Sequence, residues 1–439
     1  MTAFYKTHKT ALNIIFYFTV IFPIVFIAAL ILRYGVNVPT FDQWELVSYF
    51  QKFDAHTLTL TDIIAQHNEH RIAFPRIIML GAGYFTNWNL VAEMMISLGI
   101  QVLSFILIWK AIRRTVKGEA AKVYIVIASL VMFNPMQWEN WLWGWQIQWY
   151  LTILGMITAL YFCWYLPLKR RPLNHVIAIT AATVATFSLA GGLVTWVLLL
   201  VLLAIRKQAI ALGLYTVAFL TNAAVYLHNY HSVTGHTPIT AMFNNQLEFF
   251  RYLCLYVGGA ISNHHQIAPI AGAIIIGSFL VLSIKAILEK QKAAYFWIAL
   301  GTFVLINAAM TGSGRFLLGP EQALASRYTS ISLLLLLSVV MLVGPHIQKI
   351  VSRSTPWLQP ITICGVIIIS GMFALTSLGG IGHARSTSQR QQTASDCLNK
   401  QAAPNSACFI LVYPTSAEND KRNTIYLEFL RDEHLAGRR

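Results

Sequence analysis

Acidic side chains are scarce in this sequence, which has 17 aspartates and glutamates against 32 lysines and arginines in 439 residues. Charged residues of both signs make up only 11% of the chain, whereas hydrophobic residues make up 56%. This balance excludes an ordinary soluble globular domain. The net charge of +15 does not indicate nucleic-acid binding, because the basic residues lie in short loops between long apolar runs, as in membrane proteins.

Apolar runs long enough to cross a bilayer are abundant. We predict spans at 12–33, 90–112, 122–137, 147–168, 174–190, 192–205, 209–228, 267–288, 293–310, 329–344 and 357–378. The expected fold class is therefore all-α, a polytopic membrane protein of about eleven transmembrane helices. No internal repeat is visible, so a duplicated transporter gains no support.

Lysines and arginines between the spans indicate the orientation of the chain. They fall on one side if the amino terminus is cytoplasmic and the carboxyl tail is outside, in what we take to be a bacterial inner membrane. Segment 72–87 is short and contains Pro75, and reading it as a twelfth span would move Arg113 and Arg114 outside. We therefore expect this segment to lie on the outer leaflet or dip into it. The first apolar run lacks a small-residue cleavage site and is expected to be retained.

This topology divides the chain into two parts. Residues 1–378 form the membrane domain, with a first extracytoplasmic loop at 34–89, and residues 379–439 form a small extracytoplasmic segment. In the latter, CFILVYP (408–414) is typical of a strand, and 424–437 is typical of an amphipathic helix that ends at Gly437. We expect this α+β tail to dock on the membrane domain.

Cysteine is also rare, with five residues in the chain. Cys163, Cys254 and Cys364 lie in or beside apolar runs and are expected to be core residues. Cys397 and Cys408 both lie in the outside tail, where the compartment permits a disulfide. The sequence alone leaves open whether these two are bridged.

The stretch TDIIAQHNEHRIAFPRIIML (61–80) places Asn-Glu-His-Arg (68–71) in the middle of a segment that is otherwise apolar enough to lie against a membrane. One helix over Leu60–Ile78 would bring His67 and Arg71 into its apolar stripe, with Glu69 opposite. An arginine in such a place needs an anion, either a protein carboxylate or a ligand phosphate. The alternative is an interfacial helix whose charged residues reach lipid headgroups.

Just beyond the first span, VPTFDQWELVSYF carries Asp42 and Glu45. A carboxylate at the water edge of an apolar cavity can act as a general base on a hydroxyl group. Asp42 could instead be an ordinary cap of a helix that starts near Gln43.

Two arginines lie in the loop TGSGRFLLGPEQALASRYTS (311–330). Arg315 stands among glycines, and Arg327 stands at the start of the tenth span beside Ser326. A helix amino terminus and an arginine together suit a phosphate. The alternative is a snorkelling arginine beside a flexible glycine loop.

The aromatic turn NPMQWENWLWGWQIQWY (134–150) interleaves tryptophans with amides and one carboxylate. Sugars bind to such surfaces, which offer apolar ring faces and polar partners for hydroxyl groups. A belt of interfacial tryptophans is the other interpretation. Histidines 67, 70, 264 and 265 show no spacing diagnostic of a metal.

The order of a cytoplasmic amino terminus, a first span, an acidic residue in TFDQWE, a long outer loop and many further spans resembles the GT-C superfamily of polyprenyl-phosphate-sugar-dependent glycosyltransferases. The resemblance implies that Asp42 is the catalytic base, although this chain has Asp-x-x-Glu in place of a paired-acid motif. We assign Glu69 as a second acid and Arg71, Arg315 and Arg327 as ligands of the donor phosphate. The expected substrate-binding residues are Glu45, Asn68, His70, Trp138, Glu139, Gln146 and Tyr328.

The expected activity is transfer of a sugar from a polyprenyl-phosphate donor to an envelope glycan, lipid or protein on the outer side. The partners would be this donor, the acceptor and membrane lipids. No cofactor is indicated with certainty, and a divalent cation is the only candidate. The rival functions are an O-antigen-type ligase or polymerase acting on a lipid pyrophosphate, and a transporter or flippase, which would carry polar or broken helices at mid-membrane.

Overall fold

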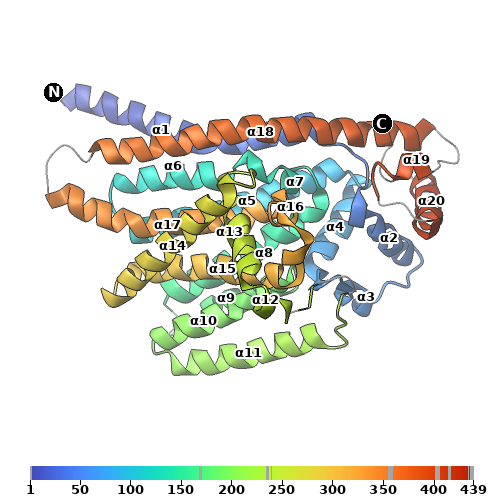
Figure 1. The fold of residues 1–439 in the computed structure, drawn as a ribbon, viewed down its shortest axis with the longest axis horizontal. Coiled ribbons are helices and arrows are strands. Elements are labelled where there is room, and N and C mark those ends of the chain that lie inside the picture. The colour runs from blue at the N-terminus through green and yellow to red at the C-terminus, as the bar shows by residue number, and fades with distance from the viewer. Residues whose placement is uncertain are drawn as a thin grey trace.

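The computed structural model describes residues 2–167, 171–233, 237–238, 240–353, 359–400, 406–413, 417–433 and 435. These residues form a helical bundle with a single pair of two-residue strands (Figure 1). The longer helices are α1 (Thr2–Tyr34), α5 (Leu90–Thr115), α6 (Ala120–Met132), α8 (Ile147–Tyr165), α9 (Pro172–Thr186), α10 (Val194–Ile205), α11 (Ala209–Leu227), α13 (Gln246–Gly258), α14 (Ile267–Leu288), α15 (Tyr295–Arg315), α17 (Ser326–Arg353) and α18 (Gln359–Lys400).

The remaining elements lie between these helices or, for α19 and α20, after α18. They are η1 (Phe41–Glu45), α2 (Leu46–Asp54), α3 (Leu60–Ile64), β1 (Gln66–His67), β2 (His70–Arg71), α4 (Ala73–Thr86), η2 (Pro135–Gln137), α7 (Trp138–Trp141), η3 (Gly144–Gln146), η4 (Ala190–Leu193), α12 (Ala241–Asn244), η5 (Lys292–Ala294), η6 (Phe316–Leu318), α16 (Pro320–Ala323), α19 (Ser406–Phe409) and α20 (Ala417–Asp432). In Figure 1, α2, α3, α4, α19 and α20 gather at one end of the bundle.

The prediction of an all-α polytopic membrane protein is confirmed. Within the described residues, eight helical segments are long and apolar enough to cross a membrane, and α9 and the Ala190–Ile205 segment are shorter apolar helices. Each of the eleven predicted runs overlaps one of these segments or α18.

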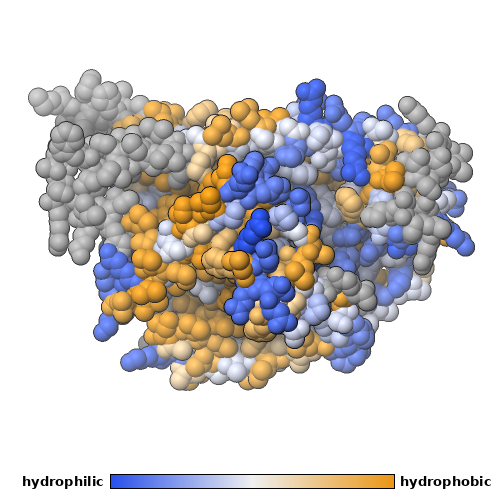
Figure 2. Space-filling view, in the orientation of Figure 1, coloured by the Kyte–Doolittle hydropathy of each residue, from blue (hydrophilic) through white to orange (hydrophobic). Residues whose placement is uncertain are grey.

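Burial separates central helices from peripheral ones. The apolar windows of 120–141, 144–165 and 326–344 are 72 to 78% buried, whereas those of α11 and α14 are 17% and 28% buried. Large apolar side chains such as Phe18, Ile210 and Ile274 are exposed on the peripheral helices. Figure 2 shows apolar residues over much of the visible side of the bundle and hydrophilic residues concentrated toward the end that carries α2 and α3. Such a surface is stable when lipid surrounds it.

The helix expected over Leu60–Ile78 is wrong, because the polar residues in its middle form a tight hairpin. Strands β1 and β2 pair antiparallel, with Gln66 opposite Arg71 and His67 opposite His70. Asn68 in the turn adopts a φ of 49°, a left-handed conformation that asparagine tolerates. Pro75 then falls in the first turn of α4, where its missing N–H costs nothing.

The carboxyl-terminal segment is helical in its described part, so the expected strand at 408–414 is wrong. Helix α18 continues past residue 379 to Lys400, and residues 408–413 form the end of α19 and a turn. Helix α20 confirms the predicted helix, while Gly437 lies outside the described residues. The pattern of CFILVYP resembles a strand because the segment is continuously apolar, which suits any buried conformation.

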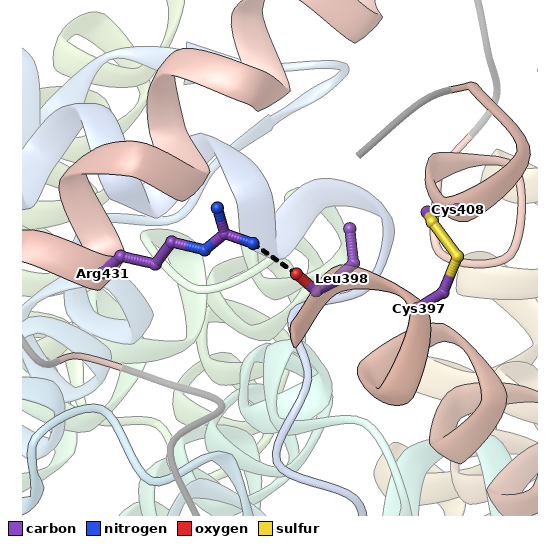
Figure 3. The surroundings of a disulfide bond; sticks show 4 residues. All are labelled: Cys397, Leu398, Cys408 and Arg431. Atoms are coloured by element: carbon purple, nitrogen blue, oxygen red, sulfur yellow. Dashed lines mark hydrogen bonds between the residues drawn. A yellow bond between two sulfur atoms is a disulfide. The ribbon is translucent and has the colours of Figure 1, made fainter. Parts of the chain in front are cut away.

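A disulfide joins Cys397 on α18 to Cys408 on α19 (Figure 3). Nearby, Arg431 on α20 donates a hydrogen bond to the carbonyl of Leu398. The tail also contacts the first loop, where the backbone N–H of Phe41 donates to the carbonyl of Val412 at 2.7 Å. The predicted docking of the tail on the membrane domain is therefore present.

Candidate active site

A polar cleft of about 280 Å³ brings together segments that are distant in the sequence. Its walls come from η1, the turn of the hairpin, the aromatic turn and the facing ends of α15 and α17. The lining residues are Phe41, Asp42, His67, Asn68, Glu69, His70, Glu139, Trp143, Trp145, Gln146, Gln148, Trp149, Arg315 and Arg327. Of the residues selected from the sequence, Asp42, Asn68, Glu69, His70, Glu139, Gln146, Arg315 and Arg327 are thus gathered in one place.

Asp42 lines the cleft beside a buried histidine. The Nε2 atom of His67 is 3.5 Å from Oδ2 of Asp42, and its Nδ1 atom is 3.0 Å from Oε2 of Glu45. His67 is 7% exposed, whereas the Asp42 side chain is 35% exposed. Among the described residues, no hydrogen bond involves Oδ1 of Asp42, so this oxygen is available to a substrate hydroxyl group.

The charge of His67 follows from this geometry. Burial lowers the pKa of His67, but the hydrogen bonds and charges of Asp42 and Glu45 outweigh burial and raise the pKa to about 9. His67 is therefore protonated at neutral pH and cannot serve as a base. Its Nδ1–H group donates to Glu45 at 3.0 Å, and its positive charge attracts the Asp42 carboxylate 3.5 Å away.

Asp42 does not cap a helix, so that interpretation of the sequence is wrong. The amino-terminal cap of η1 is Thr40, whose backbone N–H donates to Oε1 of Gln43 at 3.3 Å. Asp42 instead lies in the first turn of η1 with its carboxylate directed toward His67. Phe41 reaches this turn with a φ of 48°, held by its bond to Val412.

Glu69 occupies the turn of the hairpin and pairs with Arg315 across the cleft. Arg315 also donates from NH1 to the hydroxyl oxygen of Tyr328 at 2.7 Å. The carbonyl of Glu69 accepts a hydrogen bond from the hydroxyl of Tyr226 at 2.8 Å, which holds the turn in place. The Nε2 atom of His70 is 3.6 Å from Oε1 of Glu69.

Glu139 pairs with Arg327 on the other side of the cleft. Oε1 of Glu139 accepts a 2.8 Å hydrogen bond from NH1 of Arg327, and Oε2 accepts from the backbone N–H of Arg327 at 3.3 Å. The amino terminus of α17, which we expected to be offered to a phosphate, thus already faces a carboxylate. Asn140 strengthens this junction by donating to the carbonyl of Arg327.

Arg71, which we expected to bind the donor phosphate, lies apart from Arg315 and Arg327. Its guanidinium group donates to three backbone carbonyls, at 2.6 Å to Tyr226, at 3.0 Å to Ile64, and also to His228. Arg71 is 7% exposed and does not belong to the cleft lining. Backbone carbonyl oxygens therefore take the place of the anion that we expected beside Arg71. Arg71 holds the hairpin against the end of α11.

The aromatic turn divides between cleft and core. Trp143, Trp145 and Trp149 line the cleft, and Trp145 contacts the His67 ring edge-on at a centroid distance of 5.1 Å. Trp141 is fully buried and stacks on Tyr150 at 4.7 Å. Trp138 lies outside the cleft lining and stacks on His383 of α18 at 5.3 Å.

Two polar residues of this region were absent from the sequence-based site. His67 is one, although it adjoins the selected Asn68. Glu93 is the other: it is fully buried and accepts hydrogen bonds from Gln43 Nε2 at 3.1 Å and Trp88 Nε1 at 3.0 Å. A Cβ atom at Gly144 would come within 2.3 Å of its carboxylate, so η3 packs directly against this acid. The only signal in the sequence is an acidic residue at the start of an apolar run.

Metal binding receives no support from the described side chains. Among them, no group of three or more His, Cys, Asp or Glu residues is arranged to hold a metal ion. Both ring nitrogens of His67 already face carboxylates. No step of the reaction is therefore assigned to a cation.

No protein-family model and no curated protein sequence matches the chain significantly. Two solved structures are similar to it, both of ArnT from Cupriavidus metallidurans. In the apo state the TM-score is 0.49, and in the state bound to undecaprenyl phosphate it is 0.46. Each match has 13% sequence identity and covers 97% of this chain and 76% of ArnT.

Proposed function

We propose that this protein is a membrane glycosyltransferase that moves a sugar from a polyprenyl-phosphate donor to an acceptor hydroxyl group. The observation that carries the proposal is that Asp42 lines the same cleft as Arg315 and Arg327. A carboxylate base and two cationic donors are the groups that transfer from a phosphate-linked sugar requires. The apolar helices of the bundle, which are long enough to cross a membrane, suit a protein whose substrate carries a long lipid chain.

In the proposed step, the acceptor oxygen attacks the anomeric carbon of the donor sugar. The acceptor proton passes to Asp42, the bond between the anomeric carbon and the phosphate oxygen breaks, and its electron pair leaves with the polyprenyl phosphate. His67 holds the Asp42 carboxylate in one orientation and is a positioning residue. Tryptophans 143, 145 and 149 and glutamines 146 and 148 offer ring faces and amides to the sugar.

The two arginines would stabilise the negative charge that develops on the leaving phosphate. Arg315 and Arg327 are 19% and 30% exposed, and each pairs with one carboxylate, Glu69 or Glu139. A guanidinium group has five N–H donors, so pairing with one carboxylate leaves donors for a phosphate oxygen. The paired carboxylates also limit repulsion between the arginines in the absence of donor.

The extracytoplasmic side is the proposed location of the cleft. Helix α5 begins at Leu90, next to the loop that carries Asp42, and ends near Arg113 and Arg114. The basic residues therefore lie at the opposite end of this helix from the cleft. Because basic loops remain in the cytoplasm, the cleft would open on the outer side of a bacterial inner membrane.

Purified protein in detergent should release polyprenyl phosphate from a polyprenyl-phosphate sugar, and release should accelerate when envelope glycans or lipids are added. Thin-layer or mass-spectrometric detection of the lipid product identifies the reaction. Release of polyprenyl pyrophosphate from a pyrophosphate-linked donor would instead support a ligase or polymerase. Movement of an intact lipid-linked sugar across proteoliposomes without product release would support a flippase, and either result would overturn the proposal.

A further inference from the structure

A second cavity, of about 260 Å³, lies beside the cleft, and we name it the side cavity. It shares Phe41, Glu139 and Trp143 with the cleft lining, so the two spaces meet at a common wall. The rest of the side cavity comes from Thr40, from Trp138 and Leu142, from α18 and from Leu411 of the tail. Phe41, which precedes Asp42 in the chain, is part of the common wall.

Gln391 of α18 is a lining residue whose side chain is 7% exposed. Its Oε1 atom is buried and accepts no hydrogen bond from any residue that the structure describes. Leaving a buried amide oxygen without a donor is unfavourable, so such atoms in native proteins are rare. The Nε2 group of the same amide is not enclosed in this way and makes no hydrogen bond with any described residue, so it is the group that can donate to a ligand hydroxyl oxygen in the side cavity.

The remaining lining suits a neutral ligand with apolar faces and hydroxyl groups. Trp138, Trp143 and Phe41 offer aromatic surfaces, and Thr387 adds a hydroxyl group. The guanidinium group of Arg390 donates to the carbonyls of Ile410 at 3.3 Å and Leu411 at 3.1 Å. Since Glu139 is likewise paired with Arg327, neither charged residue of the lining calls for an ionic ligand.

We infer that the side cavity is an acceptor subsite that binds one sugar ring of a glycan. Aromatic faces beside amide and hydroxyl groups are the surface that a sugar ring recognises. The inference rests on the proposed function, because it assigns the side cavity to the acceptor and the charged cleft to the donor phosphate. It also gives the carboxyl-terminal segment a role, since α18 and Leu411 form one wall.

Binding of methyl glycosides tests the subsite without any turnover. Saturation-transfer NMR on the purified full-length protein would use methyl glycosides of gluco, galacto, manno and arabino configuration. We expect at least one to bind, and Gln391→Leu to weaken it about tenfold through loss of one buried hydrogen bond. Thr387→Val should weaken the same glycoside, whereas Gln389→Leu, on the exposed face of α18, should not.

Absence of binding by every glycoside, or equal binding by wild type and Gln391→Leu, would overturn the subsite. Turnover separates this failure from failure of the proposed function. With water as acceptor, donor hydrolysis should be unchanged in Gln391→Leu, while its stimulation by a glycan acceptor should fall. Hydrolysis with equal stimulation in both proteins would overturn the subsite alone. No release of polyprenyl phosphate by either protein would overturn the proposed function, leaving the glycoside measurement to decide the subsite.

Discussion

Single residues of the cleft are held by partners that determine their charge and orientation. His67 is the clearest case, because one buried imidazole bridges Asp42 and Glu45. A histidine that directly precedes the polar tetrapeptide 68–71 gives no such signal in the sequence. Asp42 could be predicted as a site residue from its place after the first span. His67 could not be predicted as its partner, because only the folded hairpin brings the two residues together.

Protonation of His67 should make stability depend on pH. The pKa of His67 is raised from 6.5 to about 9 in the folded protein, so the stabilisation is complete below pH 6.5 and is lost as the pH rises through 9. The shift corresponds to a contribution on the order of 3 kcal/mol. We expect the melting temperature of wild type to exceed that of His67→Gln at pH 6, with the difference shrinking toward pH 10. A difference that stays constant over this range would contradict the assignment.

Arg71 should behave as a structural residue. Lysine cannot donate to three carbonyls with the geometry of a guanidinium group, so Arg71→Lys should cost about 1–3 kcal/mol of stability. The loss of melting temperature should be the same with and without polyprenyl phosphate, and Arg385→Lys, at an exposed position, serves as control. An unchanged melting temperature with weaker lipid binding would return Arg71 to the donor site.

Among the elements, the apolar helices could be predicted from the sequence and the short elements at the cleft could not. Runs of apolar residues are long and repeated, so their identity as helices does not depend on neighbours. The hairpin at 66–71 is stabilised instead by the backbone carbonyls of Tyr226 and His228 and by the hydroxyl group of Tyr226, more than 150 residues away. No local pattern reports such partners. The sequence does not decide whether Cys397 and Cys408 are bridged, because spacing cannot show which segments meet.

Breaking the disulfide should loosen the tail and, through Val412, the loop that carries Asp42. The double variant Cys397→Ser/Cys408→Ser should lose about 2–4 kcal/mol of stability, measured as a lower melting temperature. Reductant should lower the melting temperature of wild type and leave the double variant unchanged. If reductant lowers the melting temperatures of wild type and the double variant equally, the Cys397–Cys408 bridge is not the cause of the stability loss.

At the scale of the whole molecule, the account depends on which side of the membrane the cleft faces. The distribution of lysine and arginine places the tail outside and the loop at 169–171 inside. An alkaline phosphatase reporter fused after Arg439 should be active, and one fused after Arg171 should be inactive, with the converse for a cytoplasmic fluorescent reporter. The reverse pattern would place the cleft in the cytoplasm and remove the argument for an envelope acceptor.

The most direct test of the central claim compares sugar transfer by Asp42→Asn with that by wild type. Asparagine keeps the size of the side chain but removes the proton acceptor, so transfer from a polyprenyl-phosphate sugar should fall by about 10²–10⁴-fold. Binding of polyprenyl phosphate should stay close to wild type, and the melting temperature should fall only by the part of the His67 stabilisation that the Asp42 charge supplies. Asp54→Asn, outside the cleft lining, should transfer normally. Near-normal turnover by Asp42→Asn would contradict the account, because the cleft would then lack the base on which the proposed reaction depends.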